Sequence, residues 1–503
     1  MTDSSEIRSR IGPREFSALR PYVAVLLVSV VFFVYGPLLN RHYALDTYFA
    51  EARGNQGDLQ IQLGRFLSGT LLNILAGFGV NTAVDQSFFT FLSLCLLALS
   101  LYLLIGLFFR LRQEWDIHSL LLLCLATVVS LCHVFMLGWF LFPEVVVFMM
   151  TALLLSILAV SFPMRYSGPR RWFMCYILLC AALSFYQAAG AFFVTFFLLY
   201  VSVSRAGRPI VSVMKGFGSA FVVYASAGIT NMLLIGWGGR HSGRTDFSHA
   251  NPFENLYGII ESVREKLQNT NLGVAPLFSF LFVVTALLLC CWLLLSKGPD
   301  RKDAGRTLLV LFAMTCASFA AIIMPHLFTA TVDVSPRSIA ALMSLPGVIC
   351  IFMLFQLMPP KRRMFFLTAG VLLLFLLANT FLTYSVEESR FATNRLDREI
   401  AGMVWQEITQ YEGRTGNAIR RIAFRHDTKP SLCYRGLVCY GNFRAMGTDW
   451  TVIPLLSIVS GRRFARASMP APVYDTYFEG RNWDFFSTEQ VVFQGDTLFL
   501  MLF

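Results

Sequence analysis

Apolar stretches of membrane-spanning length recur along this chain, and they constrain its fold more than any other feature. A helix that crosses the hydrocarbon core of a bilayer needs about 20 apolar residues. The chain has 503 residues, of which 56% are hydrophobic and 14% are charged, whereas soluble domains contain about 25% charged residues. Eleven stretches qualify as spans: 22–39, 87–109, 119–140, 145–162, 172–187, 189–204, 216–237, 274–295, 307–324, 338–357 and 364–384. The sequence therefore predicts an all-α polytopic membrane domain of about eleven transmembrane helices.

The loops between these stretches alternate in charge, which predicts the side of the membrane on which each lies. Lys and Arg dominate cytoplasmic loops. With the N-terminus in the cytoplasm, the cytoplasmic segments hold 19 basic and 7 acidic residues, and the outside loops hold 8 and 10. The stretches 172–187 and 189–204 could instead form one kinked helix, but this alternative places basic residues such as Lys297 and Arg301 outside. We expect eleven spans, and the net charge of +11 indicates contact with anionic lipids rather than with nucleic acid.

This topology divides the chain into three parts. Residues 1–21 are expected to be a cytoplasmic N-terminus, and residues 22–384 a transmembrane domain with an outside loop at 40–86. Residues 385–503 are polar and are expected to form an α/β domain on the outer side, which in a bacterium is the periplasm. No small-residue cleavage site follows the first apolar stretch, so this stretch is expected to remain as an anchor in the inner membrane.

Local patterns predict elements within the outside segments. Apolar residues from Leu59 to Phe78 follow a 3.6-residue period, which predicts one amphipathic helix in the membrane interface. A second helix is expected between Pro252 and Gln268. The C-terminal part reads as a helix followed by strand-like runs, at 387–411, 419–424, 450–453 and 491–503, and the last of these turns at Gly495-Asp496 as a hairpin.

Two cysteines lie outside the spans, in the sequence Cys433-Tyr-Arg-Gly-Leu-Val-Cys439. An oxidising compartment favours a disulfide between them, and the alternative is two unpaired thiols in a domain core. A zinc site is not expected, because His426 is the only histidine nearby and no further cysteine is close.

Two classes of function are disfavoured by what the sequence lacks. None of the span interiors contains Asp, Glu, Lys or Arg, whereas ion-coupled transporters bury ionisable groups at membrane depth. The cytoplasmic loops are short and contain neither a Walker A nor a GxGxxG pattern, so nucleotide hydrolysis in the cytoplasm is unsupported. Catalytic groups are therefore sought on the outer face.

Three carboxylates on that face are candidate general bases. Asp46 follows the first span by a few residues, where it could accept the proton of a sugar hydroxyl; the alternative is that it caps a helix beginning at Thr47. Glu51 lies little more than one helical turn further along. Glu144 occupies a short outside turn and is a second acid or base candidate, or else a solvated turn residue.

Other polar residues on the outer face are candidates for substrate binding. Arg65 could hold a lipid phosphate, because a guanidinium binds phosphate through two hydrogen bonds, or it could simply extend to the headgroups. Arg244 is a weaker phosphate contact, and His241 a weaker sugar contact. Tyr186 and Gln187 interrupt an apolar hairpin and could line a pocket, although Gln187 could equally cap a helix.

Several of these residues form a pattern that resembles a known family. Leu45-Asp46, then Leu63-Gly64-Arg65-Phe66-Leu67-Ser68-Gly69, then Leu183-Ser184-Phe185-Tyr186-Gln187-Ala188 are similar in order and spacing to the Gtr-type serotype-converting glucosyltransferases of bacteria and their phages. The stretch with Asn394 and Asp397 and the closing Gly495-Asp496-Thr497 strand also resemble that family.

The resemblance implies a GT-C-like membrane glycosyltransferase. Such enzymes move a hexose, by family default glucose, from a polyprenyl-phosphate donor to a polysaccharide such as O-antigen in lipopolysaccharide. Asp46 matches the acidic position of the first outer loop, but it stands alone where many GT-C enzymes carry an acidic pair, so the need for a divalent metal stays open. We expect an inverting displacement. The alternatives are a polysaccharide flippase or exporter and an O-antigen polymerase.

Overall fold

The computed structural model describes residues 10–54, 56–112, 115–166, 168–237, 251–268, 301–328, 334–356, 362–427 and 444–503. These residues include seven helices that are long and apolar enough to cross a membrane. They are α1 (Pro13–Tyr35), α5 (Gln86–Phe109), α8 (Val146–Arg165), α10 (Gly190–Ser204) with the turn η2 (Gln187–Ala189), α11 (Ile210–Trp237), α14 (Arg301–Leu327) and α16 (Arg362–Thr415). The chain is therefore an α-helical membrane protein.

Shorter helices account for three more of the expected stretches. The helices α6 (Ile117–Leu131) and α7 (Val134–Phe140) are bent by 55° at a short break and together are long enough for one span. The helices α9 (Pro169–Phe185) and α15 (Leu345–Gln356), the latter preceded by η3 (Ala340–Ser344), are also apolar. The eleventh stretch, 274–295, lies outside the described residues, so the count of eleven stays a prediction.

The chain reverses direction between α9 and α10. Tyr186 is extended between the two helices, and Gln187 contacts the loop at Leu63. Trp172, near the start of α9, lies against Phe197 of α10, with 5.9 Å between the ring centroids. The alternative of one long kinked helix is thus wrong, because the two helices form a hairpin.

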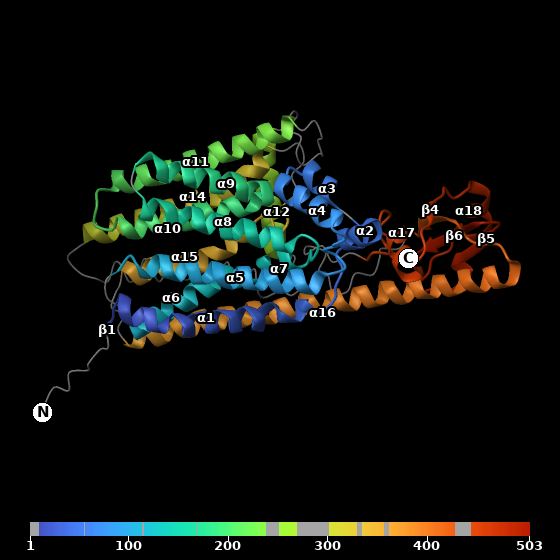
Figure 1. The fold of residues 1–503 in the computed structure, drawn as a ribbon, viewed down its shortest axis with the longest axis horizontal. Helices are drawn as coiled ribbons and strands as arrows, with labels where there is room; N and C mark the ends of the chain where they lie inside the picture. Colours follow the sequence, from blue (N-terminus) through green and yellow to red (C-terminus); the bar gives the residue numbers. More distant parts are fainter. Residues whose placement is uncertain are drawn as a thin grey trace, which may run out of the picture.

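The connections gather at two opposite ends of the bundle. At one end the short strands β1 (Arg10–Ile11) and β2 (Trp115–Asp116) pair with each other, and Arg205 and Arg306 line a small cavity. At the other end lie η1 (Gly36–Leu39), α2 (Leu45–Arg53), α3 (Gly57–Gln62), α4 (Phe66–Gly77) and α12 (Pro252–Gln268). We call this second end the loop-1 end, after the loop at 40–86 (Figure 1).

A single helix connects the bundle to the C-terminal part of the chain. The helix α16 is 54 residues long and continues from the bundle to a small sheet (Figure 1). This sheet has the strand order β4-β3-β6-β5, and its elements are β3 (Arg421–His426), β4 (Ala465–Arg466), β5 (Val491–Gln494) and β6 (Thr497–Leu502). Around it lie α17 (Val452–Ser460), α18 (Ala471–Tyr477) and η5 (Thr488–Gln490). Strand β3 is parallel to β6, and β5 and β6 form an antiparallel hairpin.

The structure confirms some of the expected local elements and corrects others. The hairpin does turn at Gly495, and the helix at 252–268 is present. The run at 450–453 is not a strand, because it leads directly into α17, whose buried residues pack on α2 and α16. The expected amphipathic helix at 59–78 is two helices, because Gly64 adopts a positive φ of 75° between α3 and α4.

A buried ion pair connects α16 to the segment that precedes α17. The Arg444 Nε lies 3.4 Å from Asp397 Oδ1, and both side chains are at most 1% exposed. The backbone N–H groups of Ala445 and Met446 also donate to this carboxylate, at 2.5 and 3.4 Å. Removing one member of a buried pair leaves the other charge without compensation, and this typically costs about 3–5 kcal/mol.

We therefore expect Asp397→Asn to lower the free energy of unfolding by about 3 kcal/mol, because Arg444 stays buried without its counter-ion. The matched control is Asp496→Asn, which breaks the exposed pair between Arg421 and Asp496 and should leave stability nearly unchanged. Thermal unfolding of the detergent-solubilised protein measures both. Equal effects of the two substitutions would contradict a stabilising role for the buried pair.

Candidate active site

Asp46 lies in the first turn of α2, at the loop-1 end of the bundle. The helix begins at Leu45 after Ala44, so Asp46 is not the N-cap, and the capping alternative is wrong. The first turn is closed instead by Thr47, whose hydroxyl accepts the backbone N–H of Ala44 at 3.0 Å. The Asp46 side chain is therefore not used in capping, and it is half-buried beside the positive end of the helix dipole.

Glu144 lies in the turn between α7 and α8 and faces α2. Its side chain is buried, with 1% of the residue exposed, so it is not a solvated turn residue. The Thr47 hydroxyl donates to Glu144 Oε2 at 2.7 Å, and Oε1 has no hydrogen-bond partner among the described residues. Burial, and next to it the charge of Asp46, raise the pKa of Glu144 to about 8.

Asp46 and Glu144 form an electrostatically coupled pair of carboxyl groups. The charge of Asp46 acts on Glu144, and Thr47, the next residue in the chain, is bonded to Glu144, so the two acids lie near each other at the loop-1 end. Near neutral pH the buried Glu144 is mostly protonated, because its pKa is about 8. Two carboxyl groups in different protonation states can supply one base and one hydrogen-bond donor.

Glu51 lies outside this pair. Its carboxylate forms an ion pair with Arg41, with 2.7 Å between Arg41 Nη2 and Glu51 Oε2. The side chain of Arg41 is 44% exposed and that of Glu51 is 14% exposed, so the arginine end of the pair faces solvent. Glu51 is thus on the same helix as Asp46 but is already engaged by a cation.

The candidate binding residues meet at a cavity of about 480 Å³ at the loop-1 end. Arg65, Tyr186 and Gln187 line it together, as do apolar residues of α9, α11 and α14. The Arg65 guanidinium lies 4.7 Å above the ring of Tyr186 and donates to Gln60 Oε1 at 2.8 Å. A volume of this size is typical of small-molecule sites, which are mostly apolar with a few polar groups.

A break between α3 and α4 places Arg65 at this cavity. Gly64 has φ of 75°, and a Cβ at this position would lie 2.5 Å from Ile235 Cδ1 and 3.0 Å from Gln187 Nε2. Only glycine accommodates both the backbone conformation and this close approach. Gln187 donates to the carbonyl of Leu63 at 3.0 Å, so it joins the hairpin to the break and is not a helix cap.

Arg337 was not among the residues that the sequence singled out, yet it connects the cavity to the carboxyl pair. It lines the cavity, and its guanidinium lies 4.0 Å above the ring of Phe142, two residues before Glu144. Its backbone carbonyl accepts the indole N–H of Trp139 at 2.7 Å. An arginine in a short polar loop does not by itself indicate a functional residue in the sequence, because only the fold brings residues 337 and 144 together.

The remaining candidates cannot be placed. Arg244, His241, Cys433 and Cys439 lie outside the described residues, so their contacts and the expected disulfide stay predictions. Within the described ranges, no group of three or more His, Cys, Asp or Glu residues could hold a metal ion. The need for a divalent metal therefore stays open.

Comparison with known proteins gives one match. The family model described as glucosyl transferase GtrII matches residues 36–355. This range includes α2, the turn at Glu144 and all the residues that line the cavity. Neither the curated proteins nor the solved structures contain a match to the chain.

The raised pKa of Glu144 predicts how stability depends on pH. Because its pKa rises from an ordinary value of 4.5 to about 8 on folding, the folded state holds a proton that the unfolded state releases between these values. The contribution of Glu144 to the free energy of unfolding is full below pH 4.5 and is lost as the pH rises toward 8. Each unit of pKa difference is worth about 1.4 kcal/mol. Glu144→Gln keeps the shape of the neutral acid and should remove this dependence. Melting temperatures of both proteins from pH 5 to pH 9 test it, and parallel curves would contradict it.

Proposed function

Because the chain belongs to the GtrII glucosyl transferase family, we propose that it moves glucose from a polyprenyl-phosphate donor to a polysaccharide such as O-antigen, at the periplasmic face of the bacterial inner membrane. The observation that carries this proposal is a mostly apolar cavity with arginines in its lining, connected through Arg337 to a pair of carboxyl groups. The same end of the bundle thus offers space for a lipid, cations for a phosphate and a base.

The lining of the cavity fits a lipid-linked phosphate sugar. Ile229, Met232 and Ile235 of α11 supply apolar surface for an isoprenoid chain. Arg65 and Arg337 supply positive charge for the phosphate, and guanidinium groups bind phosphate through paired hydrogen bonds. The amides of Gln187 and Asn231, also in the lining, can bind sugar hydroxyls.

The reaction that these residues support is a direct displacement. A hydroxyl oxygen of the acceptor forms a bond to the anomeric carbon of the donor while the bond from that carbon to the phosphate oxygen breaks. The acceptor proton passes to Asp46, and the phosphate leaves with the bonding electrons and an added negative charge. Arg65 and Arg337 stabilise that charge as it develops. One displacement inverts the anomeric configuration.

The protonated Glu144 favours Asp46 as the base. A second ionised carboxylate beside Asp46 would repel the charge of the first, whereas a neutral acid does not. The C-terminal sheet lies beyond the site at the end of α16 and is suited to contact the acceptor polysaccharide (Figure 1). Glu51 and Glu144 remain the alternatives for the base.

Asp46→Asn should abolish hexose addition, because the amide cannot accept the acceptor proton; loss of a general base typically lowers a rate by about 10²–10⁴-fold. The measurement is the composition and linkage of surface glycans in cells with the wild-type protein, the variant or no gene, at matched membrane levels. If cells with the Asp46→Asn variant still add the hexose branch, Asp46 is not the general base, and Glu144 or Glu51 takes that role. If the wild-type protein changes chain length or export without adding a sugar, a polymerase or a flippase replaces the transferase.

Arg65→Gln should raise the KM for the donor on the order of 10-fold or more, because it removes a charged hydrogen-bond donor to the phosphate. Arg65→Lys keeps the positive charge and should therefore raise the donor KM by less than Arg65→Gln does. The control is Arg53→Gln on the same loop, where Arg53 is exposed and contacts Phe49 rather than the cavity. Transfer from a synthetic polyprenyl-phosphate glucose by membranes with each protein measures this, and equal KM values for both Gln variants would exclude Arg65 from phosphate binding.

A further inference from the structure

A polar face of α16, beyond the family-matched residues 36–355, holds the segment that leads into α2. Arg390, Asn394 and Arg398 are spaced four residues apart and therefore share one face of the helix. The buried amide of Asn394 makes two hydrogen bonds to one residue of loop 1. Its Oδ1 accepts the backbone N–H of Tyr43 at 2.8 Å, and its Nδ2 donates to the Tyr43 carbonyl at 3.0 Å.

These two bonds fix the backbone where α2 begins. Tyr43 precedes Ala44, whose N–H is bonded to Thr47, and Thr47 in turn donates to Glu144. The ring of Tyr43 stacks on Tyr48 with 4.6 Å between centroids, and Arg398 donates to the Tyr43 hydroxyl at 2.5 Å. The first turn of α2, which carries Asp46, is thus held on both sides.

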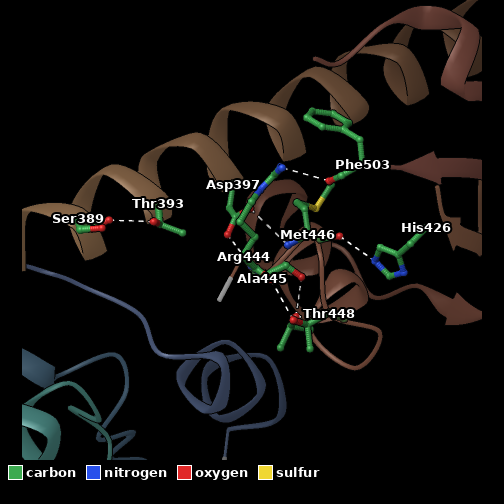
Figure 2. Close-up of polar contacts among 10 residues, drawn as sticks. Ser389, Thr393, Asp397, His426, Arg444, Ala445, Met446, Thr448 and Phe503 are labelled. Atoms are coloured by element: carbon green, nitrogen blue, oxygen red, sulfur yellow. Dashed lines mark hydrogen bonds and ion pairs between the residues drawn. The ribbon is translucent and has the colours of Figure 1, made fainter. Parts of the chain in front are cut away.

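The part of α16 that carries Asn394 is itself immobilised. Asp397, less than one turn further along, binds Arg444 and the N–H groups of Ala445 and Met446, and Arg444 also donates to the carbonyl of Phe503 at 3.1 Å (Figure 2). Tyr43 and Tyr48 belong to the same apolar core as Ile400, Val404 and Leu455. The start of α2 therefore packs on the C-terminal segment and is also bonded to the bundle through Thr47 and Glu144.

We propose that Asn394 is a positioning residue for glycosyl transfer, which sets the location of Asp46 through the backbone of Tyr43 without touching substrate. This inference rests on the proposed role of Asp46 as the base. A catalytic group must be held close to its productive geometry, and a displacement of 1 Å can lower a rate on the order of 100-fold. The C-terminal part of the chain is thus a component of the catalytic site.

The first test compares Asn394→Ala with a matched control. Gln490 is also buried, and its amide also makes two bonds to backbone, with the Ser487 N–H at 2.7 Å and the Met501 carbonyl at 2.9 Å. These partners lie before η5 and in β6, away from α2. We expect Asn394→Ala to lower kcat on the order of 100-fold with little change in the donor KM. Gln490→Ala should lower kcat far less than Asn394→Ala, because its bonds do not reach the start of α2. Equal losses in both variants would reduce Asn394 to a stabilising residue and overturn the proposal.

A double-mutant cycle shows whether Asn394 acts through Asp46. If it does, Asn394→Ala should lower the residual rate of the Asp46→Asn protein by no more than about twofold, because the two substitutions remove the same contribution, whereas the losses of independent sites would multiply. A further 100-fold loss in that background would overturn the proposal. Asp46→Asn at the wild-type rate would overturn the proposed base and this inference together, whereas an inactive Asp46→Asn with a fully active Asn394→Ala would overturn this inference alone.

Amide hydrogen exchange supplies a readout that needs no activity. In the full-length detergent-solubilised protein, Asn394→Ala should speed exchange of the backbone amides at residues 43–48 on the order of 10-fold, because one amide loses its acceptor and the turn opens more often. Gln490→Ala should leave these amides unchanged. Unchanged protection of residues 43–48 in Asn394→Ala would show that this segment does not depend on the hydrogen bonds from Asn394, and would overturn the proposal.

Discussion

The hydrogen bond from Thr47 to Glu144 joins the segment after the first span to the turn between α7 and α8, and the site is organised around it. Hydrocarbon offers no partners to polar groups, so the chemistry of a membrane enzyme collects where helices end. Here the protein buries one carboxyl group and leaves the neighbouring one half-buried. One hydroxyl closes the first turn of α2 and also fixes the orientation of Glu144, so the start of the helix and the environment of the acid cannot change independently.

Interruptions of helices supply several polar residues of the cavity, beside the apolar faces of α9, α11 and α14. Arg65 follows the break at Gly64, and Tyr186 and Gln187 stand between α9 and α10. The backbone groups that such breaks release are satisfied locally: the Leu63 carbonyl by Gln187, and the Phe185 carbonyl by the hydroxyl of Ser68. The break at Gly64 and the turn between α9 and α10 therefore stabilise each other, and the residues at both line the same cavity.

The sequence allowed prediction of the elements that depend on local pattern. Long apolar runs, the helix at 252–268 and the hairpin at Gly495 follow from periodicity and turn residues, and the family resemblance is confirmed by the match to residues 36–355. Features that depend on the distance between remote residues were not predictable. The burial of Glu144, the approach of Arg337 and the contact of Asn394 with Tyr43 each join positions more than 90 residues apart. The break at Gly64 was also missed, because the apolar period runs through it.

The unbroken length of α16 has a mechanical consequence. At 54 residues and 1.5 Å per residue it is roughly 80 Å long, whereas the hydrocarbon core is about 30 Å thick. The sheet is carried at the far end of this rod (Figure 1), and residue 394 lies part-way along the rod. Beyond Asn394 the rod continues for 21 residues to Thr415, or roughly 32 Å. Turning this arm by about 10° about Asn394 would move its end by roughly 5–6 Å. Because α17 packs on both α2 and α16, a force on the sheet is also transmitted to the start of α2.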